Sequence, residues 1–370
     1  MHTSSVLWCR PWEATSMEQR SPLPYTLISQ SKDAHMDLLD RFILSDLLAH
    51  SVTIPNNLSL QHTDVDNLLF SAFAWQEKIH LYPVVDSTNT VARQMVEAAI
   101  KEAPLHHPNG SLTRHGRKLH GSLFLAEHQT AGRGRQGRSF YSPSSVGLYL
   151  SIVVVPPGGI QDPALITATA ALAVCQALNQ VYGIAASIKW VNDIIYQGKK
   201  ICGILTEGVA DQTQGSIPAA IIGIGVNVAQ SMKGFPQELE GIAGTVLPPG
   251  DSRLQRNQLT AAIVQHLMTD LSIVWQQHKR HHSAGGIMEE YRRLSILKPG
   301  QKVEVFPLPD SSHQSYAATV LGIDHRARLQ VQLEDGSQRL LESGEVSLRS
   351  EHFTGLSRIS SIICSLVFIT

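Results

Sequence analysis

The sequence has few cysteines and almost no net charge, and its apolar C-terminal run is short. Only four of its 370 residues are cysteines, and they lie far apart without a C-x-x-C pair. This scarcity excludes a dense disulfide framework and favours a reducing compartment. Thirty basic residues against 31 acidic ones give a formal net charge of -1, so the overall balance indicates neither nucleic acid nor an anionic membrane as a partner.

Two further absences narrow the class of protein. The first residues lack the apolar run and small-residue cleavage pattern of a secretory signal, which predicts a cytoplasmic protein. The apolar run 359–370 is about half of the roughly 20 residues that a membrane helix needs. The neighbouring histidines His106-His107 and His281-His282 have no Cys, Asp or Glu at ligand spacing, so no protein metal site is predicted.

Hydrophobic patterning divides the chain into four predicted parts. Residues 1–56 form an N-terminal extension of unknown role, with one helical pattern at 36–49. Residues 57–295 form the main domain, residues 296–350 a small β-rich domain and residues 351–370 an apolar tail. With 43% hydrophobic and 16% charged residues, the composition is typical of a folded globular protein.

Strand and helix patterns mix in the main domain, which predicts an α+β fold. A polar insert at 104–120 is predicted to be a surface loop. Gly183 is predicted to end the Ala-rich, largely buried second helix, and Gln197-Gly198 to turn a hairpin. The strand patterns lie at 79–85, 122–128, 147–155, 187–190, 193–197, 200–207 and 219–228, and the helix patterns at 88–100, 164–183 and 256–279.

Short alternating strands follow Lys298-Pro299-Gly300. They cover KVEVF, AATVLGI, RLQVQL and a final pair, RLLES and EVSLR, with Asp335-Gly336 at a hairpin tip. This spacing predicts a small β-barrel of SH3-like size.

The segment 129–142, QTAGRGRQGRSFYS, carries three arginines among glycines. Gly132, Gly134 and Gly137 have the G-x-G-x-x-G spacing of a dinucleotide-binding turn, but such a turn opens a helix, whereas this segment leads into a strand. Guanidinium groups on a Gly-rich loop suit a mobile clamp for a polyphosphate, because each offers forked donors and keeps its charge. A solvated basic loop or a nucleic-acid patch remains the alternative from this segment alone.

Three other motifs accompany this segment in order along the chain. They are Asp86-Ser87-Thr88-Asn89, Lys189-Trp190-Val191-Asn192-Asp193 and Gly223-Ile224-Gly225-Val226-Asn227. Together with GRGRQGR, they resemble the biotin protein ligase family, whose motifs read DSTN, GRGRxGR, KWPND and GxGxN. The resemblance covers residues 76–295, and the β-rich end lies where the family carries its SH3-like domain.

The resemblance implies a fold, a reaction and partners. The fold is a class II synthetase-like mixed sheet flanked by helices, with the SH3-like barrel after it. The reaction is the formation of biotinyl-5'-AMP from biotin and ATP with Mg²⁺, followed by transfer of biotin to a lysine of a biotin carboxyl carrier domain. A homodimer is compatible with the family. Some members bind DNA through an N-terminal winged helix, but no helix-turn-helix pattern occurs in residues 1–60 here, so neither DNA nor a membrane is expected as a partner.

The resemblance also assigns roles to residues. Lys189 is expected to contact the biotin carboxylate and the α-phosphate, with Arg135 as the second catalytic cation. Arg133, Gly134 and Arg135 resemble the loop that binds biotin and adenylate. The remaining assignments are Arg138 for the nucleotide phosphates, Asn227 for ATP, Phe140 for the adenine, and Ser87, Thr88, Asn89 and Gln129 for the ureido group of biotin, whose donors and acceptors need polar partners in an apolar pocket.

Two departures and three alternatives accompany this interpretation. Val191 replaces the family's usual proline, and Phe140 stands where many members have tryptophan, which offers a smaller aromatic surface. Ser87 or Thr88 can also cap a helix, a role that can coexist with binding of the ureido group. The alternatives are a lipoate or octanoate ligase of the same superfamily, a DNA-binding biotin-responsive repressor, and a catalytically silent biotin-binding module.

Overall fold

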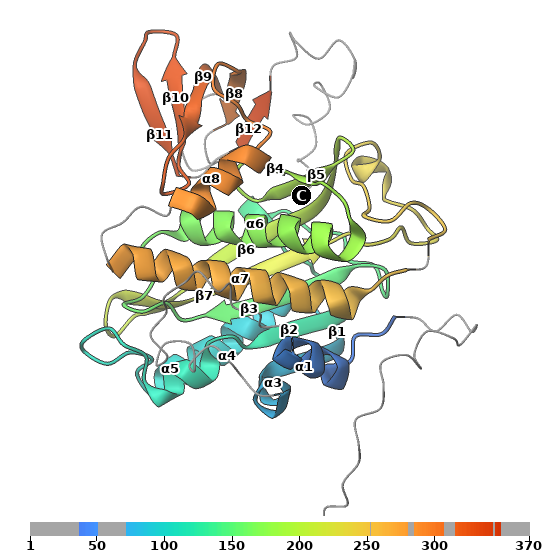
Figure 1. Cartoon of the computed structure of the whole chain (residues 1–370), viewed down its shortest axis with the longest axis vertical. Helices are drawn as coiled ribbons and strands as arrows, with labels where there is room; N and C mark the ends of the chain where they lie inside the picture. The colour runs from blue at the N-terminus through green and yellow to red at the C-terminus, as the bar shows by residue number, and fades with distance from the viewer. Residues whose placement is uncertain are drawn as a thin grey trace, which may run out of the picture. The chain divides into compact units, whose positions relative to one another are not determined.

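A seven-stranded mixed sheet organises the main part of the molecule (Figure 1). The computed structural model describes residues 37–50, 72–251, 253–279, 285–306, 315–342 and 345–348. The strand order is β1-β2-β3-β7-β6-β5-β4, and only the pair β1 and β2 is parallel. The strands are β1 Ile79–Val85, β2 Leu123–Gln129, β3 Leu148–Val154, β4 Ser187–Lys189, β5 Asp193–Tyr196, β6 Lys199–Asp211 and β7 Ser216–Val226.

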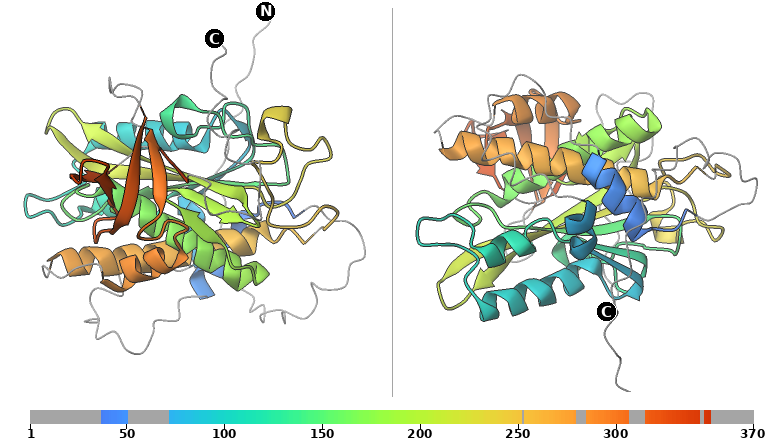
Figure 2. Two further views of the ribbon diagram at one scale, coloured as in Figure 1. Left: turned by 90° about the horizontal axis from the view of Figure 1, so that it is seen from above. Right: turned by 60° about the horizontal axis from the view of Figure 1, so that its bottom comes forward.

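Helices cover both faces of this sheet. Helices α6 (Pro163–Tyr182) and α7 (Arg256–Lys279) lie side by side on one face, and α4 (Thr88–Glu102) packs on the other (Figures 1 and 2). Shorter helices are α1 Arg41–His50, α3 Ala72–Lys78, α5 Arg114–Leu119 and α8 Gly285–Leu294. The mixed α+β fold predicted from the sequence is confirmed.

Alternation along the strands separates the two faces. On β7, Ile222 and Ile224 pack in the cluster that includes α6 and α7, while Ile221 packs in the cluster beneath α4. Successive side chains of a strand point to opposite faces, so Gly223 and Gly225 lie on the α4 face. On that face the central strand carries no side chain at these two positions, so side chains of other elements can approach its backbone.

Helix α6 is long and apolar enough to span a membrane by length and composition, but 72% of its most apolar window is buried inside the fold. Burial on all sides explains the apolar composition of a core helix. Gly183 follows it with φ 68°, the left-handed conformation that ends helices, as predicted. The predicted hairpin is also present, with Gln197 and Gly198 at φ 49° and 74° between β5 and β6.

Two segments differ from the sequence prediction. The polar insert is not simply a surface loop, because it contains α5 and buries Leu105 and Leu119 beneath α4. The helix α1, predicted as part of a separate extension, packs Leu44 and Leu48 into the main core. The rest of that extension and the apolar tail 351–370 lie outside the described residues. Most of residues 1–60, in which no helix-turn-helix is predicted, also lies outside them.

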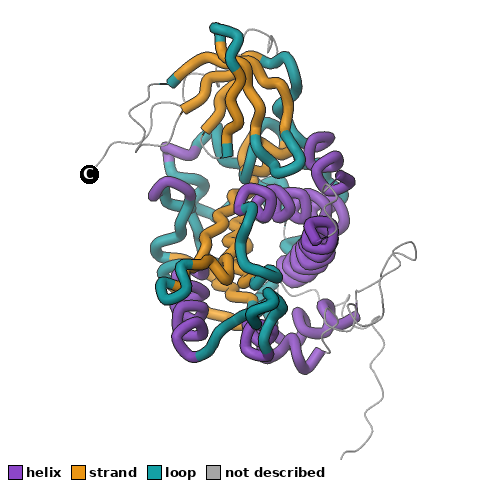
Figure 3. Tube along the Cα trace, turned by 90° about the vertical axis from the view of Figure 1, so that its left-hand side faces the viewer, coloured by secondary structure: helices purple, strands orange, loops and turns teal. Residues whose placement is uncertain are grey.

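A second sheet of five antiparallel strands forms the C-terminal part, as predicted (Figure 3). Its order is β11-β10-β9-β8-β12. Gly336, with φ 84°, lies in the predicted turn between β10 and β11. The last two strands do not pair with each other: β12 pairs with β8, so the sequence neighbours lie at opposite edges. The strands are β8 Lys302–Phe306, β9 Tyr316–Ile323, β10 Leu329–Leu333, β11 Gln338–Leu341 and β12 Glu345–Leu348.

Candidate active site

Glycines form the floor of the candidate site on the α4 face of the sheet. A Cβ atom at Gly223 would lie 2.3 Å from Asn89 Oδ1, and one at Gly225 would lie 2.5 Å from Phe140 Cε1. Gly203 on β6 is the second glycine beneath Phe140, because a Cβ atom there would lie 3.4 Å from the ring. The G-x-G motif of β7 thus allows a polar amide and an aromatic ring to approach the sheet backbone closely.

A buried polar network joins the start of α4 to the end of β2 and the middle of β3. Gln129 accepts from the Thr88 amide at 2.8 Å and donates to Ser142 Oγ at 2.9 Å. Ser151 Oγ lies 2.7 Å from Thr88 Oγ1 and 2.6 Å from Asn89 Oδ1. Burial of these side chains requires such pairing, and the network brings together three of the four residues predicted to bind a ureido group.

Ser87, the fourth residue of that set, lies at the N-cap position of α4 and is 3% exposed. Its side chain makes no capping hydrogen bond, whereas its carbonyl accepts from Thr90 and Val91. Helix capping by the hydroxyl therefore does not account for this serine.

The Arg-Gly loop, residues 132–140, folds back on itself above the glycine floor. Gly134 donates its amide to the Arg138 carbonyl at 2.7 Å, and Phe140 donates to the Gly132 carbonyl at 2.8 Å. Gly132 is buried beneath this return, where a Cβ would meet Phe140 O at 2.4 Å. A single 3-10 turn, Arg135–Gly137, occupies the tip, so the segment does not open a helix and the rejection of a dinucleotide-binding turn stands.

Two arginines of this loop reach different neighbours. Arg133 forms an ion pair with Glu207 on β6, with Nη2 to Oε1 at 3.0 Å. Arg135 donates to Asn192 Oδ1 at 2.8 Å, within the KWVND segment. Arg138 is exposed, and its Nη2 lies 3.5 Å from Gln136 Oε1 of the same loop. The loop and the KWVND segment, far apart in the sequence, therefore share one site.

Lys189 ends strand β4 on the same face of the sheet. Its neighbour Ile188 is fully buried in the cluster beneath α6, so alternation directs Lys189 to the opposite face, where the glycine floor lies. Lys189 is half-buried and pairs in register with Asp193, whose carboxylate forms an ion pair with Lys200 at 2.6 Å. Lys200 in turn lies beside Gly203, 3.3 Å from the position of its Cβ.

The turn after Lys189 is held from behind by the C-terminal part of the chain. Trp190 donates its indole N–H to the Ala327 carbonyl at 2.8 Å, and Tyr291 donates to the Val191 carbonyl at 3.2 Å. The Trp190–Val191 peptide bond is cis, although Val191 replaces the family's proline.

Asn227 lies at the end of β7 and has a local structural partner. Its side-chain amide donates to the Gly244 carbonyl at 3.1 Å, and its carbonyl accepts from Val246. These bonds hold the segment that follows the sheet.

Two charged residues of the site were not singled out from the sequence. Glu207 contacts Asn89, Arg93 and Arg133, and Lys200 contacts Asp193. Both are charged residues within the strand β6, and a charge within an otherwise apolar strand pattern was the sequence signal that could have indicated them. The site as a whole is cationic, because the arginines and lysines named here outnumber the two carboxylates.

Neither buried cysteine of the described chain takes part in this site. Burial raises the pKa of the Cys175 thiol to about 12, and it raises the pKa of Cys202 as well. Both thiols are therefore inert core groups at neutral pH. Among the described residues, no group of three or more His, Cys, Asp or Glu side chains forms a metal site.

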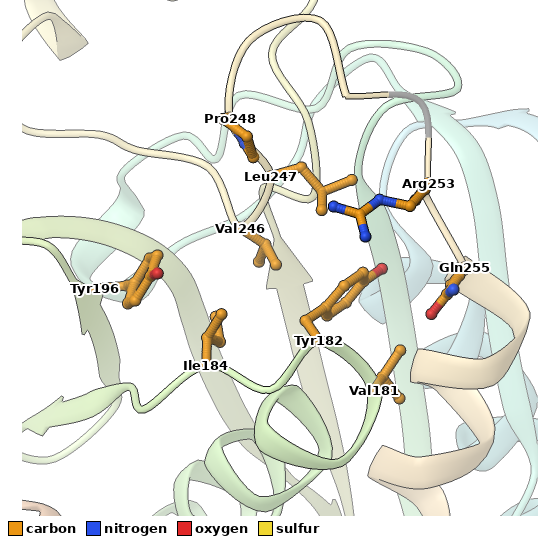
Figure 4. Close-up of a pocket in the computed structure, with 9 residues that line it drawn as sticks. All are labelled: Val181, Tyr182, Ile184, Tyr196, Val246, Leu247, Pro248, Arg253 and Gln255. Atoms are coloured by element: carbon orange, nitrogen blue, oxygen red, sulfur yellow. The ribbon is translucent and has the colours of Figure 1, made fainter.

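A small pocket of about 190 Å³ lies elsewhere, at the C-terminal end of α6 (Figure 4). Val181, Tyr182 and Tyr196 contribute to its wall, together with Val246 and Arg253. None of the predicted site residues lines it, so it is separate from the polar network on the other face of the sheet.

The comparisons with known proteins agree with this geometry. Residues 81–227 match the model of the Biotin/lipoate A/B protein ligase family. The "Bifunctional ligase/repressor BirA" of Bacillus subtilis is 36% identical over 161 residues, which are 44% of this chain and 48% of that protein. The "Biotin--[acetyl-CoA-carboxylase] ligase" of Mycobacterium tuberculosis is 30% identical over 218 residues, which are 58% of this chain and 74% of that protein.

A solved structure, "Biotin protein ligase from Aquifex aeolicus in complex with biotin and ATP", shares the fold with a TM-score of 0.54 at 22% identity, covering 74% of this chain and 98% of that one. The chain spans about half the length of the Bacillus relatives that it matches. Fold and site together define a domain of the biotin/lipoate protein ligase type, with a cationic loop over a glycine floor. The chain belongs to the biotin protein ligase family.

Proposed function

We propose that this protein activates biotin with ATP as biotinyl-5'-AMP and transfers the biotinyl group to a lysine of a biotin carboxyl carrier domain. The observation that carries the proposal is the meeting of the Arg-Gly loop and the KWVND segment, through Arg135 and Asn192, beside a buried polar network. The names of the relatives support the same substrate and acceptor class.

The first step joins two anions, a carboxylate and a triphosphate. The biotin carboxylate oxygen forms a bond to the α-phosphorus, and the bond to diphosphate breaks. Lys189 and Arg135 lower the repulsion and stabilise the charge that develops as diphosphate leaves. Arg138, exposed at the outer side of the loop, is assigned to the departing phosphates.

The polar network binds the other end of biotin. A cyclic urea presents one carbonyl and two N–H groups, so it needs both donors and acceptors. Thr88, Asn89 and Gln129 offer both in one buried cluster, and Ser87 adds a hydroxyl without a capping partner. Phe140, above Gly225, is assigned to the adenine and Asn227 to ATP.

Mg²⁺ supplies charge screening for the triphosphate when it is bound. Mg²⁺ commonly binds the substrate phosphates together with one or two carboxylates, and no protein ligand is assigned to it. In the second step the acceptor's lysine amine attacks the acyl carbon, and AMP leaves. The loop excludes water from the mixed anhydride until then.

The test is a mass measurement on the acceptor. The pure protein is incubated with ATP, Mg²⁺, biotin and a biotin carboxyl carrier domain, and the acceptor is expected to gain one biotinyl group. Lipoic acid in place of biotin is the control for the neighbouring ligase type of the same superfamily. Labelling with lipoyl and not with biotin would replace the proposal by that alternative, and no labelling with either would refute it.

The proposal places the protein in the cytoplasm, where acceptor and ATP meet. A repressor function is not proposed, because no feature of the described residues favours it. A homodimer likewise has no supporting observation.

A further inference from the structure

Glu207 contacts side chains from the Arg-Gly loop and from α4. Its carboxylate accepts from Asn89 Nδ2 at 2.8 Å and lies 3.2 Å from Arg93 Nη2. Both oxygens also face Arg133, with Nη2 to Oε1 at 3.0 Å and Nη1 to Oε2 at 3.3 Å. Glu207 therefore connects the loop, the helix and the sheet at one point.

The two arginines around Glu207 are not equivalent. Arg93 belongs to α4 and its side chain is 29% exposed, whereas that of Arg133 belongs to the loop and is 44% exposed. A largely buried carboxylate, 15% exposed, needs a cationic partner. Arg93 is such a cationic partner on a helix. Arg133 can therefore leave Glu207 for an anionic ligand while the carboxylate stays paired with Arg93.

Glu207 also fixes the orientation of the Asn89 amide. One end of the amide donates to Glu207, and the other end lies 2.6 Å from Ser151 Oγ. An asparagine held at both ends presents a defined oxygen and a defined nitrogen to its surroundings. The same carboxylate therefore acts on the loop through Arg133 and on the polar network through Asn89.

We propose that Glu207 is a positioning residue that latches the Arg-Gly loop over the site through Arg133 and orients Asn89 for the ligand. The ligand part of this inference rests on the proposed function. The latch itself does not, because it concerns the protein without ligand. The two roles differ in what they require: the latch requires a negative charge, and the orientation of Asn89 requires only an acceptor oxygen.

The variants Glu207→Gln and Glu207→Ala separate these roles. Glutamine keeps an acceptor for Asn89 but has no charge for Arg133, whereas alanine removes both. Glu97→Gln is the matched control, since Glu97 also faces Arg93, at 3.9 Å, but is 48% exposed and lies on α4 itself. Thermal unfolding of each variant establishes that it is folded.

Limited trypsin digestion without ligand measures the latch at the Arg138–Ser139 bond. Cleavage follows the population of the open loop, and loss of a charge-assisted pair should raise it about tenfold in both Glu207 variants and not in Glu97→Gln. Arg133→Gln breaks the same pair from its exposed side, so it should give a similar increase, and combining it with Glu207→Gln should add nothing. Equal cleavage in wild type and Glu207→Gln would overturn the latch.

Steady-state biotinyl-5'-AMP formation measures the orientation of Asn89. The KM for biotin should rise about tenfold in Glu207→Ala and less than about threefold in Glu207→Gln, with kcat less affected in both. Equal KM values in the two variants would overturn this role. If wild type makes no adenylate, the proposed function fails, and the digestion experiment still decides the latch.

Discussion

The position of the Phe140 ring depends on two glycines beneath it, which differ in how much room they leave for a side chain. A methyl group at Gly225 would meet the ring at 2.5 Å, whereas one at Gly203 would lie 3.4 Å away, in ordinary contact. Gly225→Ala should therefore displace Phe140 and raise the KM for ATP about tenfold, because overpacking costs ~1–3 kcal/mol. Gly203→Ala should change it less than about threefold.

Adenylate formation with varied ATP measures this pair of variants. Equal KM values for ATP in both would show that Phe140 does not contact the nucleotide. Circular dichroism and thermal unfolding serve as the control that neither alanine disturbs the sheet.

The roles proposed for the two cations Lys189 and Arg135 can be tested by truncation of each side chain. Lys189→Ala or Arg135→Ala should lower the rate of biotin-dependent pyrophosphate exchange by about 10²–10³-fold, which is typical for loss of one group that stabilises developing charge. Lys189 is half-buried at a strand end and Arg135 lies on a loop, so the fold should survive. Exchange at the wild-type rate in both variants would reject these roles.

Site residues could be predicted from the sequence where they stand together in a short motif. The polar set at 87–89 and the arginines of the loop stand in contiguous motifs, and Thr88, Asn89 and Gln129 do meet in one network. Glu207 was not predicted, because its partners Arg93 and Arg133 lie 114 and 74 residues away in the sequence. Only the sheet brings these charges together.

Helix α7 contains a carboxyl group in an apolar environment. Asp270 is 7% exposed, and its Oδ2 atom has no hydrogen-bond partner within the described part of the chain. Burial raises the pKa of this carboxyl group to about 7. Its protonated form is thus favoured in the folded state, and the stability that this form provides is full below pH 3.8 and is lost as the pH rises toward 7.

Asp270→Asn removes this titration while keeping the shape of the side chain. The free energy of unfolding of the variant minus that of the wild type should be about 2–3 kcal/mol larger at pH 8 than at pH 5, since one pKa unit corresponds to ~1.4 kcal/mol. The variant is thus relatively more stable at pH 8, where the wild-type carboxylate is ionised. Urea unfolding of both proteins at the two pH values measures the difference. A constant difference would show that Asp270 is ionised in the folded state across this range.

Long helices and strands could be predicted from hydrophobic periodicity, whereas a short helix and a strand pairing could not. The strands β1, β2, β3 and β7 and the helices α6 and α7 lie where the patterns predict, because one face of each is apolar. Helix α5 was missed because Leu105, Leu112 and Leu119 are few apolar anchors in an otherwise polar insert. The pairing of β12 with β8 was missed because alternation indicates a strand but not its neighbour.

At the scale of the whole molecule, the C-terminal sheet supports Lys189, the lysine proposed to be catalytic. The turn between β9 and β10 accepts the Trp190 N–H at the Ala327 carbonyl, and Arg292 donates to the Ile323 carbonyl at 3.0 Å. Trp190 is 3% exposed and directly follows Lys189. The position of Lys189 therefore depends on a sheet that begins more than a hundred residues later in the chain.

Trp190→Phe tests this support, because it keeps an aromatic ring and removes one buried donor. The unpaired Ala327 carbonyl should cost about 1–3 kcal/mol in the free energy of unfolding. Adenylate formation should fall more than this stability loss explains, since the protein remains folded at the assay temperature while the lysine is less well held. Arg326→Ala is the control: it removes an ion pair with Asp162 on a side chain that is 43% exposed, so it should cost less than ~1 kcal/mol and leave the rate unchanged. A Trp190→Phe protein with reduced stability but the wild-type rate would show that the C-terminal sheet stabilises the fold without positioning Lys189.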